Sequence, residues 1–488
     1  MAEENPKLSP SLLLFAALQL FLFFFFSASS QSFIGVNYGE VADNLPPPSA
    51  TTTLLQSTSI SKVRLYGADP AILRALSGTG VGVFIGVSNG EIPSLASDPA
   101  VANRWIASNV LPFIPSTNIL LISVGNEVLT SGDPTLPSQL LPAMQNLHSA
   151  LLSVAGADQI KISTVHSMAV LGQSEPPSSG AFQASLADTL KGLLGFLEST
   201  GSPFAVNPYP YFANGSDTRP ETLAFCLFQP NQGRFDPGSR ITYMNMFDAQ
   251  VDAVRSALNG LGGKDVEIVV AETGWPYKGD PNEVGATVEN AKAYNGGLVS
   301  HLRSMVGTPL MPGKSVDTYF FALYDEDLKP GPASERSFGL YRLDGTMNYD
   351  IGLARSVQAA PAGPSLPTSA KKPTGYCVPR PGVSDAQLQA NLDYACAQGI
   401  DCTPIQAGGS CYLPNTVVSH AAYAMNLFYQ KSVKNPGNCD FRQTAALVMG
   451  NPSAWVDCLV HCALCGACQT LLHGALLMCA VSAYILDI

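Results

Sequence analysis

Short apolar segments separated by longer amphipathic stretches recur along the first 350 or so residues of the chain. Eight β-prone segments predict buried strands, at residues 33–38, 62–66, 81–87, 119–124, 160–165, 204–209, 266–271 and 318–324. Helical periodicity appears between them, at residues 100–110, 140–155, 186–198, 249–258 and 289–305. Strand–helix alternation repeated eight times predicts a (β/α)8 TIM barrel, which typically needs about 250 residues and tolerates insertions. An open doubly wound sheet would need a glycine-rich phosphate turn after an early strand, and the sequence has none of that form.

The two ends of the chain differ in composition from this repeating part. An apolar run at residues 12–26, followed by small residues, predicts a signal peptide over residues 1–30, although Glu3 and Glu4 outnumber Lys7 before it. Residues 358–375 are rich in Pro, Ala, Ser and Lys and predict a linker. We therefore expect a barrel domain at residues 31–357, a small domain at residues 376–458 and an apolar tail at residues 459–488.

Cysteine usage changes across the predicted linker. Of the eleven cysteines only Cys226 precedes it, and six fall in the small domain: Cys377, Cys396, Cys402, Cys411, Cys439 and Cys458. Six cysteines in a compact secreted domain predict three disulfides, for which fifteen pairings are open. The remaining four lie in the tail, where Cys462, Cys465 and Cys468 form a CxxCxxC run. We do not assign a metal to that run, because apolar residues surround it. The apolar end of the tail instead resembles a glycolipid-anchor signal, which predicts attachment to the outer face of the plasma membrane.

Charge and motif content exclude several functional classes. The net charge is −11 and no run rich in Lys or Arg is present, so we expect no nucleic-acid partner. The sequence also lacks the GxSxG elbow of serine hydrolases and the HExxH motif of zinc proteases. We expect no metal or other cofactor, and a monomer.

Two carboxylates follow apolar strands directly. Glu127 comes after the segment 119–124, and Glu272 comes after the segment 266–271. In a TIM barrel, residues at the ends of strands meet at one face, where active sites lie. Paired carboxylates on either side of one bond carry out glycoside hydrolysis, with retention at a separation of about 5–5.5 Å and inversion at about 6.5–9.5 Å. The sequence does not give this separation.

Aromatic, amide and charged residues at the other strand ends complete the predicted sugar cleft. Trp275, which follows Glu272 closely, is expected to offer an apolar platform for a sugar ring. The further candidates for substrate binding are Tyr38, Arg64, Tyr66, Asn126, Asn207, Tyr209, Tyr211, Tyr324, Glu326 and Lys329. The one N-glycosylation sequon with an allowed middle residue begins at Asn214, so a glycan there would stand at the rim of the cleft.

The strand-end motifs resemble those of plant glycoside hydrolase family 17, whose members are mostly glucan endo-1,3-β-glucosidases. The resemblance rests on GVNYG, KVRLYGADP, SVGNEV, NPYPYF, VVAETGWP and FALYDEDLKPGP, which occur in order from residue 33 to about residue 357. It implies a (β/α)8 barrel and a retaining mechanism on β-1,3-glucans such as callose. It also implies that Glu127 is the general acid/base and Glu272 the nucleophile. Thr273 stands where the family usually has serine.

The cysteine-rich part resembles a family 43 carbohydrate-binding module, which binds β-1,3-glucan in plants, and this resemblance implies a small, disulfide-rich and mainly helical domain. The segments YCVPRPGVSDAQLQANLDYACAQGIDC, PIQAGGSCYLPNTVVSHAAYAMNLFYQ and NCDF carry this resemblance, with Tyr376 in place of the usual tryptophan. The combined hypothesis is a secreted wall enzyme held on its glucan substrate. Two alternatives remain: a transglycosylase that uses the same carboxylates, and a wall-binding structural protein without catalysis.

Overall fold

The computed structural model describes residues 34–355 and 376–448, apart from residues 218, 381, 408, 410, 413–414 and 432–435. The predicted signal peptide, the linker, Cys458 and the apolar tail lie outside the described residues. Within the described part, no helix is long and apolar enough to span a membrane.

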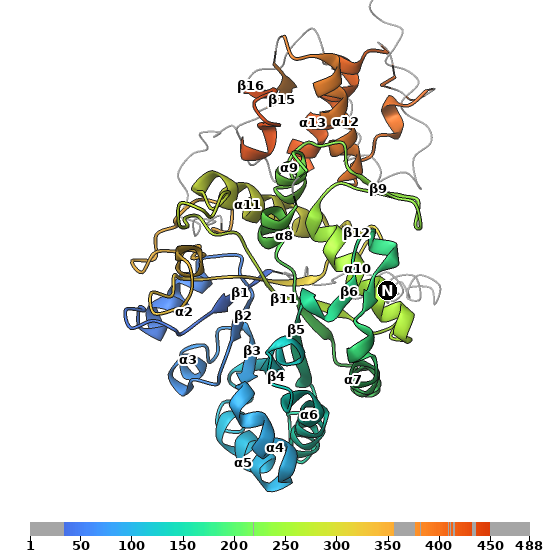
Figure 1. Ribbon diagram of the computed structural model, residues 1–488. Helices are drawn as coiled ribbons and strands as arrows, with labels where there is room; N and C mark the ends of the chain where they lie inside the picture. The colour runs from blue at the N-terminus through green and yellow to red at the C-terminus, as the bar shows by residue number, and fades with distance from the viewer. Residues whose placement is uncertain are drawn as a thin grey trace, which may run out of the picture.

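Eight parallel strands form a closed barrel, as the sequence predicts (Figure 1). Around the barrel they are β1 (Ile34–Tyr38), β2 (Lys62–Leu65), β3 (Gly82–Val87), β4 (Asn118–Asn126), β5 (Lys161–Ser167), β8 (Phe204–Asn207), β11 (Ile268–Thr273) and β14 (Asp317–Phe320). Closure occurs where β1 pairs with both β2 and β14. All eight predicted apolar segments supply one of these strands.

Helices surround the barrel and cover its outer face. They are α2 (Pro48–Gln56), α3 (Pro70–Ala75), α4 (Ile92–Ser97), α5 (Pro99–Asn109), α6 (Leu136–Leu152), α7 (Ala187–Thr200), α10 (Met246–Leu261) and α11 (Val288–Ser304). Two short helices, α8 (Pro210–Ser216) and α9 (Thr222–Cys226), follow β8. The described loops between the barrel strands form three two-stranded sheets: β6 (Leu171–Gln173) with β7 (Ala181–Phe182), β9 (Arg234–Asp236) with β10 (Ile241–Tyr243), and β12 (Gly307–Thr308) with β13 (Met311–Pro312).

Side chains alternate between the two faces of each barrel strand. On β11, Val269 and Ala271 belong to the cluster that also holds Phe84 and Tyr319, whereas Val270 packs in the larger core. Both faces are therefore buried, which explains why these strands appear in the sequence as nearly continuous apolar runs.

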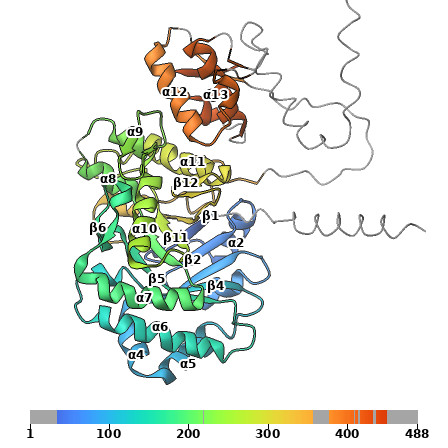
Figure 2. The same ribbon diagram turned by 90° about the vertical axis from the view of Figure 1, so that its right-hand side faces the viewer.

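Among its described residues, the small domain has two α-helices and a two-stranded sheet, in agreement with the predicted disulfide-rich, mainly helical module. Its elements are β15 (Tyr376–Pro379), α12 (Asp385–Ala397), α13 (Val417–Lys431) and β16 (Ala445–Val448). Disulfides join Cys377 to Cys439 and Cys396 to Cys402, and Cys411 is also disulfide-bonded. Both ribbon views place this domain against α9 and α11 of the barrel (Figures 1 and 2).

Candidate active site

Glu272 reaches the open end of the barrel because β11 departs from regular alternation there. Continued alternation after Val269 and Ala271 would leave Thr273 inside and turn Glu272 toward the helices. The register between β11 and β14 shifts between Val270 and Thr273, and such irregularities re-aim side chains next to active sites. The Thr273 hydroxyl consequently bonds the Tyr294 hydroxyl on α11, while the Glu272 carboxylate accepts a hydrogen bond from Arg64 on β2.

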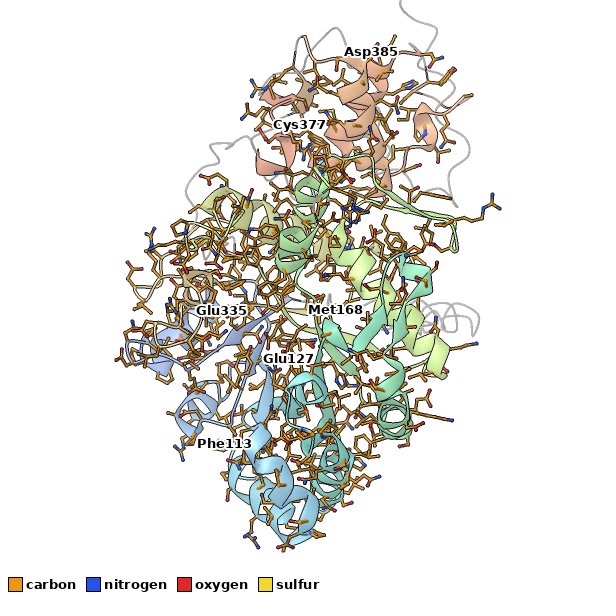
Figure 3. All side chains as sticks on the ribbon, viewed as in Figure 1. Phe113, Glu127, Met168, Glu335, Cys377 and Asp385 are labelled. Carbon is orange, nitrogen blue, oxygen red and sulfur yellow. A yellow bond between two sulfur atoms is a disulfide. The ribbon has the colours of Figure 1, made fainter. Side chains whose placement is uncertain are left out.

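Glu127 follows β4 in a left-handed backbone conformation, with φ 54°. Its own N–H donates to the carbonyl of Val165 on β5, at 2.8 Å. Gly125, two residues earlier, also has positive φ, and a Cβ there would lie 2.4 Å from a methyl of Val128. Left-handed non-glycine residues gather at functional sites, where surrounding structure holds them in place. This turn points the Glu127 side chain over the barrel, and Figure 3 shows the residue at the centre of the strands.

Arg64 on β2 connects the surroundings of the two carboxylates. One guanidinium nitrogen donates to Glu272 Oε1 at 2.7 Å, and the other donates to Asn126 Oδ1 at 2.8 Å. The Arg64 side chain is almost entirely buried and also stacks over the ring of Tyr66. Because a buried charge must be paired to be tolerated, the ion pair with Glu272 is what allows the Arg64 guanidinium to be buried here.

Two further donors come from the end of β8. The Tyr209 hydroxyl donates to Glu272 Oε2 at 2.9 Å, and the Asn207 amide donates to Glu127 Oε1 at 2.8 Å. Burial, together with the charge of Glu272, raises the pKa of Tyr209 well above its ordinary value, so its hydroxyl remains a donor. Asn207 and Tyr209 of the NPYPYF motif therefore donate one hydrogen bond to each of the two carboxylates.

The environment of Glu127 favours its protonated form. Burial is the main cause that raises the pKa of Glu127 above its ordinary value, and the charge of Glu272 acts in the same direction. The hydrogen bond from Asn207 and the positive charges of Arg64 and Lys329 oppose this change without cancelling it. A carboxyl group with a raised pKa beside a carboxylate that is paired with an arginine is the arrangement that acid-assisted bond cleavage requires.

A third carboxylate, Glu326, is buried, which raises its pKa, and it lies close enough to Glu272 for the charge of Glu272 to raise that pKa further. It accepts a hydrogen bond from the backbone N–H of Val41 at 3.0 Å. Lys329 lies 3.4 Å from Glu335 and sits over the ring of Phe321. The predicted residues Glu326 and Lys329 thus contribute charge near the site and make polar contacts with Val41 and Glu335, respectively.

Several sequence-predicted residues do not face the carboxylates. Thr51 on α2 bonds the hydroxyls of both Tyr38 and Tyr324, which tie the first and last strands to that helix. The prediction that Trp275 forms a sugar platform is wrong. Trp275 is 0% exposed, and its indole N–H donates to the carbonyl of Gly285. Tyr211 is also mostly buried, with its ring edge against Trp275.

An exposed aromatic ring that was not singled out from the sequence lies next to Tyr209. Phe212 on α8 is 52% exposed and packs beside Tyr209 and Tyr211. Its presence in the NPYPYF motif was the available signal. Asn214, the predicted glycan site, lies two residues further along the same helix and is partly exposed.

The described residues contain no group of His, Cys, Asp and Glu side chains that could hold a metal ion.

Comparison with protein families identifies both parts of the chain. Residues 34–353 match the model for glycosyl hydrolases family 17, and residues 375–446 match the X8 domain. The first match includes β1 to β14 and hence Glu127, Glu272 and all of the donors described above.

Similar proteins cover both domains. Glucan endo-1,3-beta-glucosidase 7 of Arabidopsis thaliana is 63% identical over 89% of this chain and 86% of its own length. Glucan endo-1,3-beta-D-glucosidase of Olea europaea is 60% identical over 88% of this chain and 93% of its own length. Among solved structures, CJP38, a beta-1,3-glucanase and allergen of Cryptomeria japonica pollen, is 41% identical with a TM-score of 0.62. That comparison covers 66% of this chain and 99% of the other. By its matched barrel and these relatives, the chain belongs to glycosyl hydrolase family 17, with an X8 carbohydrate-binding domain after the barrel.

Proposed function

We propose that this protein is an endo-hydrolase that cleaves internal β-1,3-glucosidic linkages of β-1,3-glucans such as callose, with retention of configuration. The observation that carries the proposal is the pairing of Glu127 and Glu272 at one rim of the barrel, with Arg64 bonded to Glu272 and to the neighbour of Glu127. The names of the relatives from Arabidopsis thaliana and Olea europaea support β-1,3-glucan as the substrate.

In the first step, the Glu272 carboxylate attacks the anomeric carbon while the carboxyl proton of Glu127 passes to the leaving glycosidic oxygen. The bond between the anomeric carbon and that oxygen breaks, and a glycosyl ester with Glu272 forms. In the second step, Glu127, now ionised, takes a proton from a water molecule. The water oxygen bonds to the anomeric carbon and Glu272 leaves as carboxylate, which restores both groups.

Arg64 and Tyr209 stabilise the charge on Glu272 before attack and again when it leaves. Asn207 orients Glu127 toward the leaving oxygen through a bond to one carboxyl oxygen, which leaves the other free for proton transfer. Arg64 and Asn207 lie on barrel strands, and Tyr209 follows β8 by two residues at the start of α8, so the geometry is in place before substrate arrives.

The replacement Glu272→Ala tests the nucleophile. Turnover of β-1,3-glucan should be abolished, while retention of the protein on insoluble β-1,3-glucan should persist. Glu267→Ala is a matched control, because Glu267 precedes the same strand but is exposed and pairs with Lys314. It should hydrolyse as the parent does. Hydrolysis by Glu272→Ala at the parent rate would remove Glu272 from its proposed role.

Retention is tested separately by following the anomeric proton signals of the first products by NMR. The β-anomer should appear before mutarotation, and an initial α-anomer would mean inversion. Longer products from a single defined oligosaccharide would instead indicate transfer to a sugar rather than to water.

The domain organisation completes the proposal. A signal peptide at residues 1–30 directs secretion to the cell wall, and the X8 domain holds the barrel on wall glucan. A glycolipid anchor signalled by residues 459–488 attaches the protein to the outer face of the plasma membrane, and Asn214 carries a glycan. Mass spectrometry of the secreted protein's two ends and of the peptide around Asn214 tests all three modifications.

A further inference from the structure

The small domain makes specific contacts with the outer wall of the barrel. The Tyr394 hydroxyl on α12 donates to the carbonyl of Phe228, and Tyr394 is buried. Asn438 donates to the Ser300 hydroxyl on α11 at 3.0 Å. On the apolar side, Met244 of the barrel belongs to the hydrophobic cluster of the small domain. These contacts hold the small domain against the barrel.

A cavity of about 690 Å³ lies between the barrel and the small domain. The barrel contributes α11 and the loop at residues 227–230, and the small domain contributes the end of α12, α13 and residues 440–443. Ligand pockets typically measure about 300–1,000 Å³ and occur preferentially at domain interfaces. Glu127, Glu272 and Arg64 are absent from the lining, so the cavity is separate from the catalytic centre.

Two adjacent glycines, Gly296 and Gly297, open α11 toward this cavity. Glycine is unfavourable within a helix, so such positions usually have a packing or functional reason. Packing explains Gly297, because a Cβ there would lie 2.7 Å from Phe228. It does not explain Gly296, where a Cβ would meet only Ile351 at ordinary contact distance, 3.8 Å. At Gly296 the missing side chain leaves room in the cavity instead.

The lining combines aromatic rings with polar groups of both charges. Phe428 on α13 is partly exposed and lies edge-on to Phe441. Glu289 and Lys292 on α11 both line the cavity, and neither takes part in an ion pair within the described residues. Mixed charge does not favour a polyanion or a polycation. A neutral polyol with apolar ring faces fits such walls, because its faces pack on aromatic rings and its hydroxyls take hydrogen bonds from either charge.

We propose that this cavity is a second binding site for a β-1,3-glucan chain, formed jointly by α11 of the barrel and by the X8 domain. The choice of glucan rests on the proposed function and on the carbohydrate-binding character of the X8 domain. A chain held here lies outside the catalytic cleft. It anchors the protein to insoluble glucan while the cleft works on another stretch, and two linked contacts raise the overall affinity above that of either one.

The replacement Gly296→Met tests this site by filling the cavity with a flexible apolar side chain. Gly195→Met is the matched control, because Gly195 is an exposed glycine within α7 with no atom within 4 Å of its Cβ position. Both changes replace a helical glycine by a strong helix former, so both chains should fold. Thermal unfolding checks that they do.

Retention of Gly296→Met on insoluble β-1,3-glucan should fall by roughly a factor of ten or more, because the joint avidity of two contacts is lost. Turnover of laminaripentaose, a soluble substrate whose cleavage needs no second contact with the protein, should equal that of Gly195→Met. Equal retention by the two variants would show that the cavity is a packing gap and would overturn the proposal.

Binding stoichiometry provides an independent readout. Calorimetric titration of the Glu272→Ala chain with laminarihexaose should show two sites, and the double variant with Gly296→Met should have lost one. An unchanged stoichiometry would refute the second site. Failure of the proposed function is distinguishable, since it appears as absent turnover in the parent protein whatever the variants bind.

Discussion

The hydrogen bond from Asn207 to Glu127 leads to a prediction about the pH profile. Burial raises the pKa of Glu127, while the Asn207 amide opposes that change by stabilising the carboxylate. Asn207→Leu keeps the volume of the side chain and removes the donor. The pKa of Glu127 should therefore rise further, and the protonated form needed for catalysis should persist to higher pH.

The size of the effect follows from the kind of bond that is lost. A hydrogen bond to a charged group contributes about 1.5–3 kcal/mol, and one pKa unit corresponds to about 1.36 kcal/mol. Glu127 is only partly buried, so water can replace part of the lost bond, and the lower end of this range applies. The basic limb of the kcat/KM profile should move up by about one pH unit.

The assay is kcat/KM against pH on a soluble β-1,3-gluco-oligosaccharide. Tyr209→Phe is the matched control, because it removes a hydrogen bond of similar length, 2.9 Å against 2.8 Å, from Glu272 instead of Glu127. The control should leave the basic limb in place, although its activity falls. If the basic limb moved with Tyr209→Phe and stayed with Asn207→Leu, the roles assigned to the two carboxylates would have to be exchanged.

Three further replacements test other parts of the site. Trp275→Phe should lower the free energy of unfolding by about 1–3 kcal/mol, because a buried hydrogen bond from the indole N–H and packing contacts are lost. Its KM should not change. A higher KM at unchanged stability in thermal unfolding would mean that the indole contacts sugar. Phe212→Ala should raise KM for long glucans about three- to tenfold, since it removes an exposed aromatic face worth about 1 kcal/mol, and an unchanged KM would exclude it from the cleft. Gly125→Ala should destabilise the barrel by more than about 1 kcal/mol, because its φ is +74° and its Cβ would clash with Val128; full stability in denaturant unfolding would contradict this.

The architecture was predictable because each barrel strand is buried on both faces. Residues 266–271 and 119–124 appear as apolar runs for that reason, and β11 and β4 form there. Helix boundaries were predicted less well. The predicted helix at 140–155 begins at Leu136 in the structure, where a proline occupies the first turn, and it ends at Leu152. The short helix α3 was not predicted, since six residues carry too little periodicity.

The candidate site was predictable in its chemistry and less so in its geometry. Strand-end position placed Arg64, Asn126, Asn207 and Tyr209 near the carboxylates, because parallel strands in a barrel end at one face. The same reasoning misplaced Trp275. Its side chain turns into the layer between strands and helices, and no local pattern distinguishes that orientation from an exposed one. The contacts between the two domains join residues such as Phe228 and Tyr394, which are far apart in the chain and share no sequence signal.

The two carboxylates meet only because each strand breaks its own regularity at its end. Strict alternation along β11 would turn Glu272 toward the helices, and a right-handed backbone at Glu127 would aim its side chain elsewhere. Arg64 stabilises both irregular strand ends, because it donates hydrogen bonds to Glu272 and to Asn126, the residue before Glu127. Local rules of strand geometry fail where the chemistry is, as expected when function rather than stability sets the conformation. The irregular turn after an apolar strand is therefore a better indicator of this site than the aromatic residue that follows it.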